Sequence, residues 1–214
     1  MTEAQWLAWK DPRSMLESIR NKASDRKLRL CLGACCRRVL EPTGGQRRWQ
    51  VLTAMEGFAD GVVSPQAVQD AIREDLPEEY DNRTLVGYDP IWHFDVTSLL
   101  SALTNPDSIT PVDVVTRSWR LATDTPVAAI AMAGLVRDVF NPFRRVIIDP
   151  GWLTSNVNDL ARTIYEEKAF ERLPILADAL MDAGCANEQL LNHLRSPGPH
   201  VRGCWALDLI LSKE

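Results

Sequence analysis

The chain lacks any uninterrupted apolar run of the roughly 18 residues that a membrane-spanning helix needs. Its most apolar segment, residues 126–136, is followed directly by Arg137 and Asp138. The opening residues, MTEAQWLAWKDP, include the acidic Glu3 and no long apolar stretch, a pattern unlike that of a secretory signal peptide. From these absences we expect a cytoplasmic protein that does not insert into a membrane.

Short catalytic motifs are absent as well. The sequence contains no phosphate-binding glycine loop, no Gly-x-Ser-x-Gly nucleophile elbow and no His-Glu-x-x-His zinc motif. These absences favour a non-enzymatic protein, although a site assembled from distant residues would leave no local motif. Cysteine occurs in an odd number, five, in a chain expected in a reducing compartment. Disulfides are therefore not expected, and buried thiols or a metal site are the alternatives.

Charge is unevenly distributed along the chain, although the net charge is only −5. Residues 10–48 contain 11 basic and 4 acidic residues, whereas residues 56–113 contain 2 basic and 12 acidic residues. The basic segment 13–48, with Trp49, is a candidate nucleic-acid-binding surface, because phosphate contacts need several basic side chains on one face. The acidity of the whole chain favours the alternative, in which the two segments neutralise each other within the fold.

Capping residues and apolar spacing predict a succession of helices. In residues 25–40 apolar side chains recur every three or four positions, with Ser24 before them as the N-cap. Further helix starts are predicted at Asp11-Pro12, Ser64-Pro65, Asp89-Pro90, Pro111, Thr125-Pro126 and Ser155, and a last helix over residues 203–211. The run Val146-Ile147-Ile148 resembles a strand, but no second run nearby can pair with it.

These elements predict an all-α fold of about ten helices in antiparallel hairpins. An apolar fraction of 45% and a charged fraction of 25% are typical of a globular protein. Residues 77–89 are expected to form an irregular central loop and residues 141–154 a linker. The linker divides the chain into an N-terminal helical part, 1–140, and a C-terminal helical part, 141–214, which we expect to pack as one compact unit.

Several phrases resemble an uncharacterised family of paralogous proteins expanded among planctomycete bacteria. They are SDRKLRLCLGACCRRVL, FADG, NPFRRVIIDPGWL, IYEEKAFERLPILADALMDAGC and HLRSPGPHVRGCWALDLIL. The resemblance covers roughly residues 1–60 and 140–214. That family has no assigned activity, cofactor or catalytic residue, so no functional position carries over. The phrase LPILADALMDAG is also similar to a short module found beside repeat domains in the same bacteria, which implies an interaction or regulatory role.

The candidate metal ligands are Cys185, His193, His200 and Cys204, all near the C-terminus. Their Cys-x7-His-x6-His-x3-Cys spacing is wider than that of cysteine-knuckle zinc sites. If Cys185 and His193 shared a helix, they would stand about 12 Å apart, too far to bind one ion. The alternative is that both cysteines pack as small apolar side chains, with His193 at a helix end and His200 in a turn.

A second cysteine cluster, Cys31, Cys35 and Cys36, lies within the predicted helix 25–40. Flanking arginines can lower a thiol pKa, yet cysteines on an apolar helix stripe more often pack.

Three functions remain open from sequence. We expect first a non-enzymatic helical interaction, adaptor or regulatory protein with a protein partner and no cofactor. The alternatives are a regulatory module stabilised by structural zinc and a nucleic-acid-associated factor that uses the basic segment 13–48.

Overall fold

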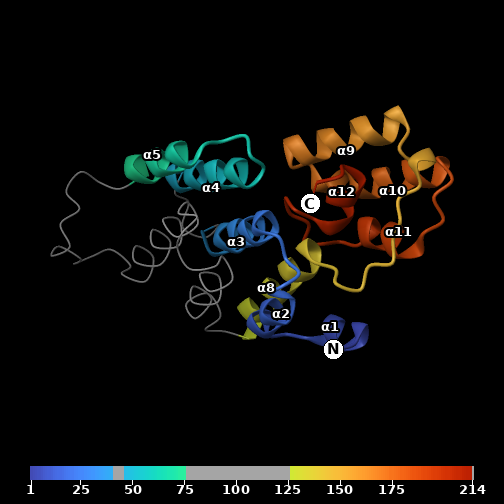
Figure 1. Cartoon of the computed structure of the whole chain (residues 1–214), viewed down its shortest axis with the longest axis horizontal. Coiled ribbons are helices and arrows are strands. Elements are labelled where there is room, and N and C mark those ends of the chain that lie inside the picture. The colour runs from blue at the N-terminus through green and yellow to red at the C-terminus, as the bar shows by residue number, and fades with distance from the viewer. Residues whose placement is uncertain (41–45, 76–125, 214) are drawn as a thin grey trace. The chain divides into compact units, whose positions relative to one another are not determined.

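The computed structural model describes residues 1–40, 46–75 and 126–213 (Figure 1). This part of the chain contains ten α-helices and two short 3-10 helices, and it contains no strand. The predicted all-α class is therefore confirmed. The predicted loop 77–89 and the helices expected after Asp89-Pro90 and Pro111 lie outside the described residues. In the described part, no helix combines the length and the apolar character needed to span a bilayer.

The chain divides into two compact units. Unit 1 comprises Met1–Ala8 and Gly134–Glu214, and unit 2 comprises Trp9–Ala133. Helix α8 (Pro126–Val139) contributes residues to both units. The sequence suggested a division at residue 140, whereas the structure divides the chain within α8 and joins Met1–Ala8 to the C-terminal unit.

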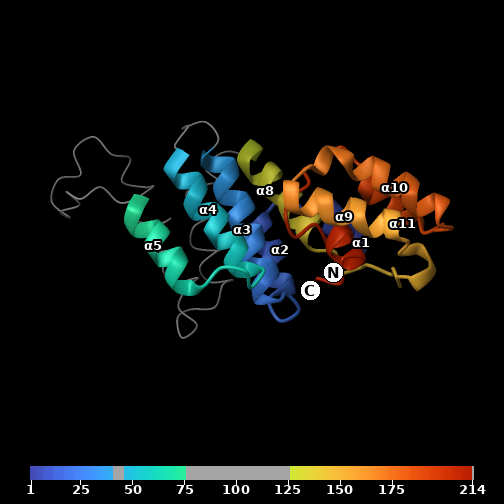
Figure 2. The ribbon, with the colours of Figure 1, turned by 90° about the horizontal axis from the view of Figure 1, so that it is seen from above.

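Unit 2 contains four further helices, which are α2 (Pro12–Ile19), α3 (Asp25–Leu40), α4 (Gln46–Ala59) and α5 (Pro65–Asp75). Helix α4 packs against both α3 and α5 (Figure 2). Three predicted N-caps are present in unit 2. The Asp11 carboxylate accepts hydrogen bonds from the N–H groups of Arg13 and Ser14, and the hydroxyls of Ser24 and Ser64 each accept one from the N–H three residues on. Local capping thus sets where these helices begin.

Unit 1 contains α1 (Glu3–Ala8) and four C-terminal helices, which are α9 (Ser155–Glu167), α10 (Leu173–Asp182), α11 (Glu188–Arg195) and α12 (Trp205–Ile210). Short 3-10 helices at Pro150–Trp152 and Phe170–Arg172 precede α9 and α10. Helices α10 and α12 each pack against α9 and α11 (Figure 1). The strand-like run 146–148 lies in a stretch without regular secondary structure. The N-cap of α9 is Thr154 rather than Ser155, because the Thr154 hydroxyl accepts the Val157 N–H.

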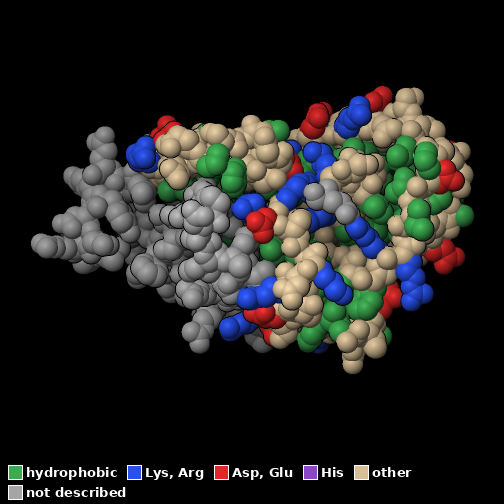
Figure 3. All heavy atoms as spheres, in the orientation of Figure 1, with side chains coloured by type: hydrophobic (Ala, Val, Ile, Leu, Met, Phe, Trp, Pro, Cys, Tyr) green, Lys and Arg blue, Asp and Glu red, His purple; other side chains and the backbone are tan. Residues whose placement is uncertain are grey.

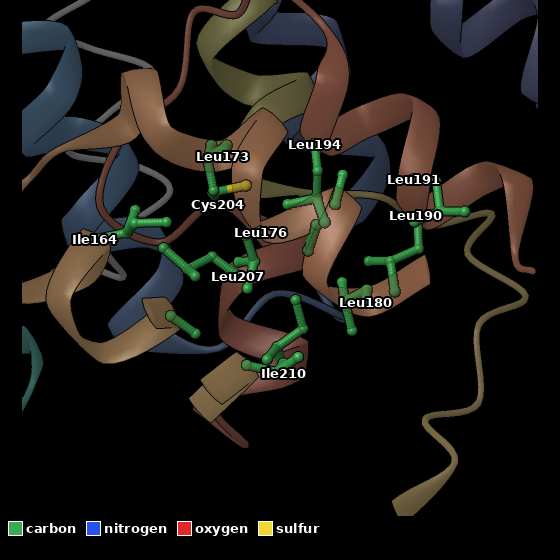
Figure 4. Close-up of a cluster of buried hydrophobic side chains, with 14 of the residues drawn as sticks. Ile164, Leu173, Leu176, Leu180, Leu190, Leu191, Leu194, Cys204, Leu207 and Ile210 are labelled. Atoms are coloured by element: carbon green, nitrogen blue, oxygen red, sulfur yellow. The ribbon is translucent and has the colours of Figure 1, made fainter. Parts of the chain in front are cut away.

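The hydrophobic core of unit 1 gathers aliphatic side chains from α9, α10, α11 and α12 (Figure 4). Helix α10 buries Leu173, Leu176 and Leu180, which recur every three or four residues and so lie on one face. Burying each such side chain contributes about 1.5 to 3 kcal/mol of transfer free energy. Cys185 and Cys204 belong to the same core. This packed core fixes α11 and the start of α12, which carry two of the candidate ligands.

Candidate metal site

Four potential metal ligands come together in unit 1. Asp138 lies in the last turn of α8, His193 lies in α11, His200 lies in the segment that joins α11 to α12, and Cys204 is the N-cap residue of α12. One ligand atom from each residue lies within 4.8 Å of the others. Among the residues that the structure describes, this is the one group of its kind. A buried Asp/His/His/Cys group of this type can hold a metal ion.

The segment between α11 and α12 brings His200 back toward α11. Its first residue, Ser196, ends α11, and its backbone N–H and its hydroxyl both donate to the His193 carbonyl. Gly198 has a φ of +88°, and a Cβ there would lie 2.7 Å from the His200 backbone nitrogen. Only glycine fits such a position without strain. Because α12 begins at Trp205, later than the predicted residue 203, His200 and Cys204 meet across a turn and not along a helix.

The cluster is shielded from solvent. Cys204 is 0% exposed, and the side chains of Asp138, His200 and His193 are 3%, 6% and 19% exposed. Asp138 Oδ1 lies 2.7 Å from His200 Nδ1 and 3.2 Å from His193 Nε2. Cys204 Sγ lies 3.2 Å from the same His193 Nε2. Two imidazole nitrogens, one carboxylate oxygen and one sulfur therefore face a common point.

Mutual interaction favours the charged forms of Asp138 and His200. Burial raises the pKa of Asp138, but hydrogen bonds from His193 and His200 and the attraction to His200 outweigh burial and lower that pKa below its usual value. Burial likewise lowers the pKa of His200, while the Asp138 carboxylate and the Ser196 carbonyl outweigh burial and raise it. Without a metal ion, the contact between the two side chains thus favours an imidazolium–carboxylate pair.

Groups outside the cluster fix the orientation of Asp138 and His200. The Val201 N–H donates to Asp138 Oδ2 at 2.9 Å, which leaves Oδ1 for the cluster. The Ser196 carbonyl oxygen lies 3.0 Å from His200 Nε2, and because a carbonyl only accepts hydrogen bonds, Nε2 carries a proton. His200 Nδ1, which faces Asp138, is therefore the nitrogen that can bind a metal ion once it has lost its proton.

The opposite arrangement holds at His193. The Trp205 indole N–H donates to His193 Nδ1 at 3.1 Å. An indole nitrogen only donates, so Nδ1 is the unprotonated nitrogen and Nε2 carries the proton of the neutral ring. Asp138 Oδ1 and Cys204 Sγ each lie 3.2 Å from that Nε2.

Three of the four candidate ligands predicted from sequence are in this cluster, which are His193, His200 and Cys204. Cys185 is not a member. It lies before α11 and packs, 4% exposed, into the hydrophobic core. The fourth member is Asp138, which sequence reasoning missed. The available signal was its position three residues after Leu135 on an apolar helix, because a carboxylate on a buried face requires a partner.

The cysteines of α3 show the properties of packing residues. Cys31, Cys35 and Cys36 are all buried in unit 2. Burial raises the pKa of Cys36 to about 12, so its thiol stays protonated at neutral pH. Since the thiolate is the reactive form, Cys36 is a poor nucleophile.

Arginines of the basic segment bind acidic side chains within unit 2. Arg26 Nε lies 2.9 Å from Asp60 Oδ1, and Arg37 Nε lies 2.7 Å from Glu56 Oε1. Both carboxylates come from the start of the acidic segment, as expected if the two segments neutralise each other. Binding of nucleic acid by residues 13–48 stays a prediction.

Apolar side chains are also found on the surface, among charged ones (Figure 3). Exposed large examples come from separate segments, namely Met1, Leu7, Val62, Ile130, Ile147, Ile175 and Met181. Single exposed apolar side chains are ordinary in folded proteins. The expected protein partner therefore stays a prediction.

The Asp138, His193, His200 and Cys204 group combines burial, convergence and metal-binding chemistry. Function has to be inferred from that chemistry, because no family model, no curated protein and no solved structure matches the chain.

Proposed function

We propose that unit 1 is a zinc-binding helical module in which Asp138, His193, His200 and Cys204 are the ligands. The observation that supports it is the convergence of four ligand atoms, one from each residue, within 4.8 Å of one another in a buried place. Asp138 is far in sequence from the other three residues, so local sequence geometry alone does not bring the four together.

The donor set suits zinc. One thiolate, two imidazoles and one carboxylate are all zinc ligands, and the sulfur disfavours magnesium or calcium. At bond lengths of about 2.0 to 2.3 Å, the corners of a zinc tetrahedron lie about 3.3 to 3.6 Å apart. The distances between cluster atoms run from 2.7 Å to at most 4.8 Å and bracket that range. The longest separation exceeds the tetrahedral edge by at most about 1.2 Å, so small shifts of the side chains would complete the tetrahedron.

The surroundings of two ligands also suit a metal ion. A ligating histidine commonly donates its second ring N–H to a carbonyl, as His200 Nε2 does to Ser196. A ligating carboxylate is commonly held by a hydrogen bond, as Asp138 Oδ2 is by the Val201 N–H. Both side chains are thus oriented before an ion arrives.

The proposed role of the ion is structural or regulatory. Four protein ligands fill a tetrahedral zinc, and catalytic zinc keeps one position for water or substrate. The ion would join the end of α8, helix α11 and the start of α12. We therefore propose that zinc stabilises unit 1 and that the module acts through its folded surface and not through catalysis.

Cobalt substitution tests this function directly. Purified full-length protein is reduced, stripped with a chelator and titrated with Co²⁺, which reports on a thiolate ligand by a sulfur-to-cobalt charge-transfer band. We expect the band to saturate at one ion per chain and to disappear when Zn²⁺ is added. Cys204→Ser should abolish it.

Cys185→Ser is the matched control, because Cys185 is a buried thiol of the same core that lies outside the cluster. This variant should keep the band. Absence of any band in the parent protein would show that the four side chains form a metal-free hydrogen-bonded network. A band lost in Cys185→Ser but kept in Cys204→Ser would show that Cys185, and not Cys204, is the thiolate ligand.

A further inference from the structure

Trp205 makes one specific polar contact, and that contact is with the cluster. Its Nε1–H donates to His193 Nδ1 at 3.1 Å, and the two rings lie 4.7 Å apart between centroids. Trp205 is 2% exposed and begins α12. Water therefore does not compete strongly for this hydrogen bond.

The direction of this hydrogen bond opposes metal binding. A neutral imidazole that binds a metal ion through Nε2 must carry its proton on Nδ1. At His193 that Nδ1–H would face the Trp205 N–H, so two donors would meet without an acceptor. His200 has no such conflict, because its second nitrogen faces the Ser196 carbonyl. The two histidines of one site are thus prepared for metal binding to different degrees.

We propose that Trp205 is a positioning residue that weakens metal binding by holding His193 in the tautomer protonated on Nε2. The inference rests on the proposed zinc site. When the ion binds, the ring proton moves from Nε2 to Nδ1, and the Trp205–His193 hydrogen bond breaks. Because Trp205 is the first residue of α12, metal binding would change a contact at the start of that helix. The site would then release its ion more readily than one with two acceptor-oriented histidines, which suits reversible, regulatory binding.

The expected effect follows from the loss of one buried hydrogen bond. Such a bond stabilises the metal-free form and is lost when the ion binds, so its removal raises the free energy of the metal-free form and strengthens zinc binding. A contribution of typical size corresponds to about a tenfold change in affinity. Trp205→Phe keeps an aromatic ring and removes the N–H, and we expect it to bind Zn²⁺ about tenfold more tightly than the parent protein.

Competition titrations against a chromophoric chelator measure the zinc affinities of the full-length parent protein, Trp205→Phe and Trp6→Phe. Trp6 is a suitable control, because it is also 2% exposed in unit 1 and has no ring contact or hydrogen bond with His193. Trp6→Phe should leave the affinity unchanged. Equal or weaker binding by Trp205→Phe, with the parent protein binding zinc, would overturn this inference and leave the zinc site standing. Failure of the parent protein to bind zinc would overturn both.

A second measurement needs no variant. Nitrogen-15 NMR of the metal-free parent protein should show His193 protonated on Nε2 and the Trp205 indole N–H slow to exchange with solvent. Saturating Zn²⁺ should move the ring proton to Nδ1 and speed that exchange. An unchanged indole N–H in the zinc-bound protein would contradict the proposal even if Trp205→Phe failed to fold.

Discussion

Asp138→Asn keeps the shape of the side chain and removes its charge, so it perturbs the centre of the cluster. In the metal-free protein, His200 would lose its carboxylate partner at a place where its side chain is 6% exposed. Removing one member of a buried ion pair costs about 3 to 5 kcal/mol. The amide oxygen can still accept the Val201 N–H, and His200 can release its proton. We therefore expect a loss of about 2 to 3 kcal/mol in the free energy of unfolding.

Zinc adds a second, separable effect. An ion that binds only the folded protein adds about 1.4 kcal/mol for each tenfold rise in its free concentration above Kd, or about 4.1 kcal/mol at 1,000 times Kd. For a chain of this size, about 4 kcal/mol raises Tm by roughly 8 to 16 °C. Asp138→Asn lacks one charged ligand, so its Tm should respond much less to zinc.

Thermal unfolding in chelator and in graded zinc buffers, under reducing conditions, measures both effects. Asp178→Asn is the control, because it makes the same chemical change in an ion pair with Arg195 where the Asp178 side chain is 69% exposed. Exposed pairs contribute about 0 to 1 kcal/mol, so this variant should keep the full zinc response. A zinc response in Asp138→Asn as large as that of the parent protein would refute the assignment of Asp138.

Three further outcomes are expected. In chelator, the free energy of unfolding should fall as pH rises above about 6.5, the unfolded pKa of histidine. Asp138 raises the pKa of His200 in the folded protein, so the stabilisation is lost as pH passes that higher pKa. A free energy of unfolding that does not change with pH, or a pH dependence that stays the same in His200→Gln, would contradict this. Glu56→Gln should destabilise unit 2 by about 1 to 3 kcal/mol, as seen by urea unfolding, because Arg37 loses its carboxylate. Cys36 should resist a thiol reagent in the native protein and react only after unfolding, and rapid native labelling at Cys36, located by mass spectrometry, would show that its thiol is accessible.

The starts of helices could be read from the sequence because capping is a local effect. Asp11, Ser24 and Ser64 each accept a backbone N–H two or three residues on, so a few residues determine the outcome. At Thr154-Ser155 two good caps are adjacent, and the sequence alone does not choose between them. The structure selects Thr154.

Only part of the metal-ligand cluster could be predicted from the sequence, because its contacts with Asp138 join residues that are far apart in the chain. The sequence indicates three of the ligands, because metal-binding residue types occur close together at His193, His200 and Cys204. Asp138 is far from them in sequence, and only the fold brings α8 beside the α11–α12 turn. Cys185 has the same chemistry as Cys204, but its side chain points into the core, which depends on how the turn after α10 packs.

The protonation pattern was also beyond sequence reasoning. It depends on which way two hydrogen bonds run, one from His200 to Ser196 and one from Trp205 to His193. Ser196 and Trp205 both lie in the terminal segment, yet nothing in their spacing indicates that they act on His200 and His193 in opposite senses. Such detail follows from the three-dimensional contacts alone.

X-ray absorption at the zinc edge tests the central claim most directly. Full-length protein loaded with one equivalent of zinc should show one sulfur at about 2.3 Å and three nitrogen or oxygen ligands at about 2.0 to 2.2 Å. Cys204→Ala should lose the sulfur shell, and Cys185→Ala should retain it. A zinc spectrum with only oxygen and nitrogen neighbours in the parent protein, or no retained zinc after desalting, would contradict the account.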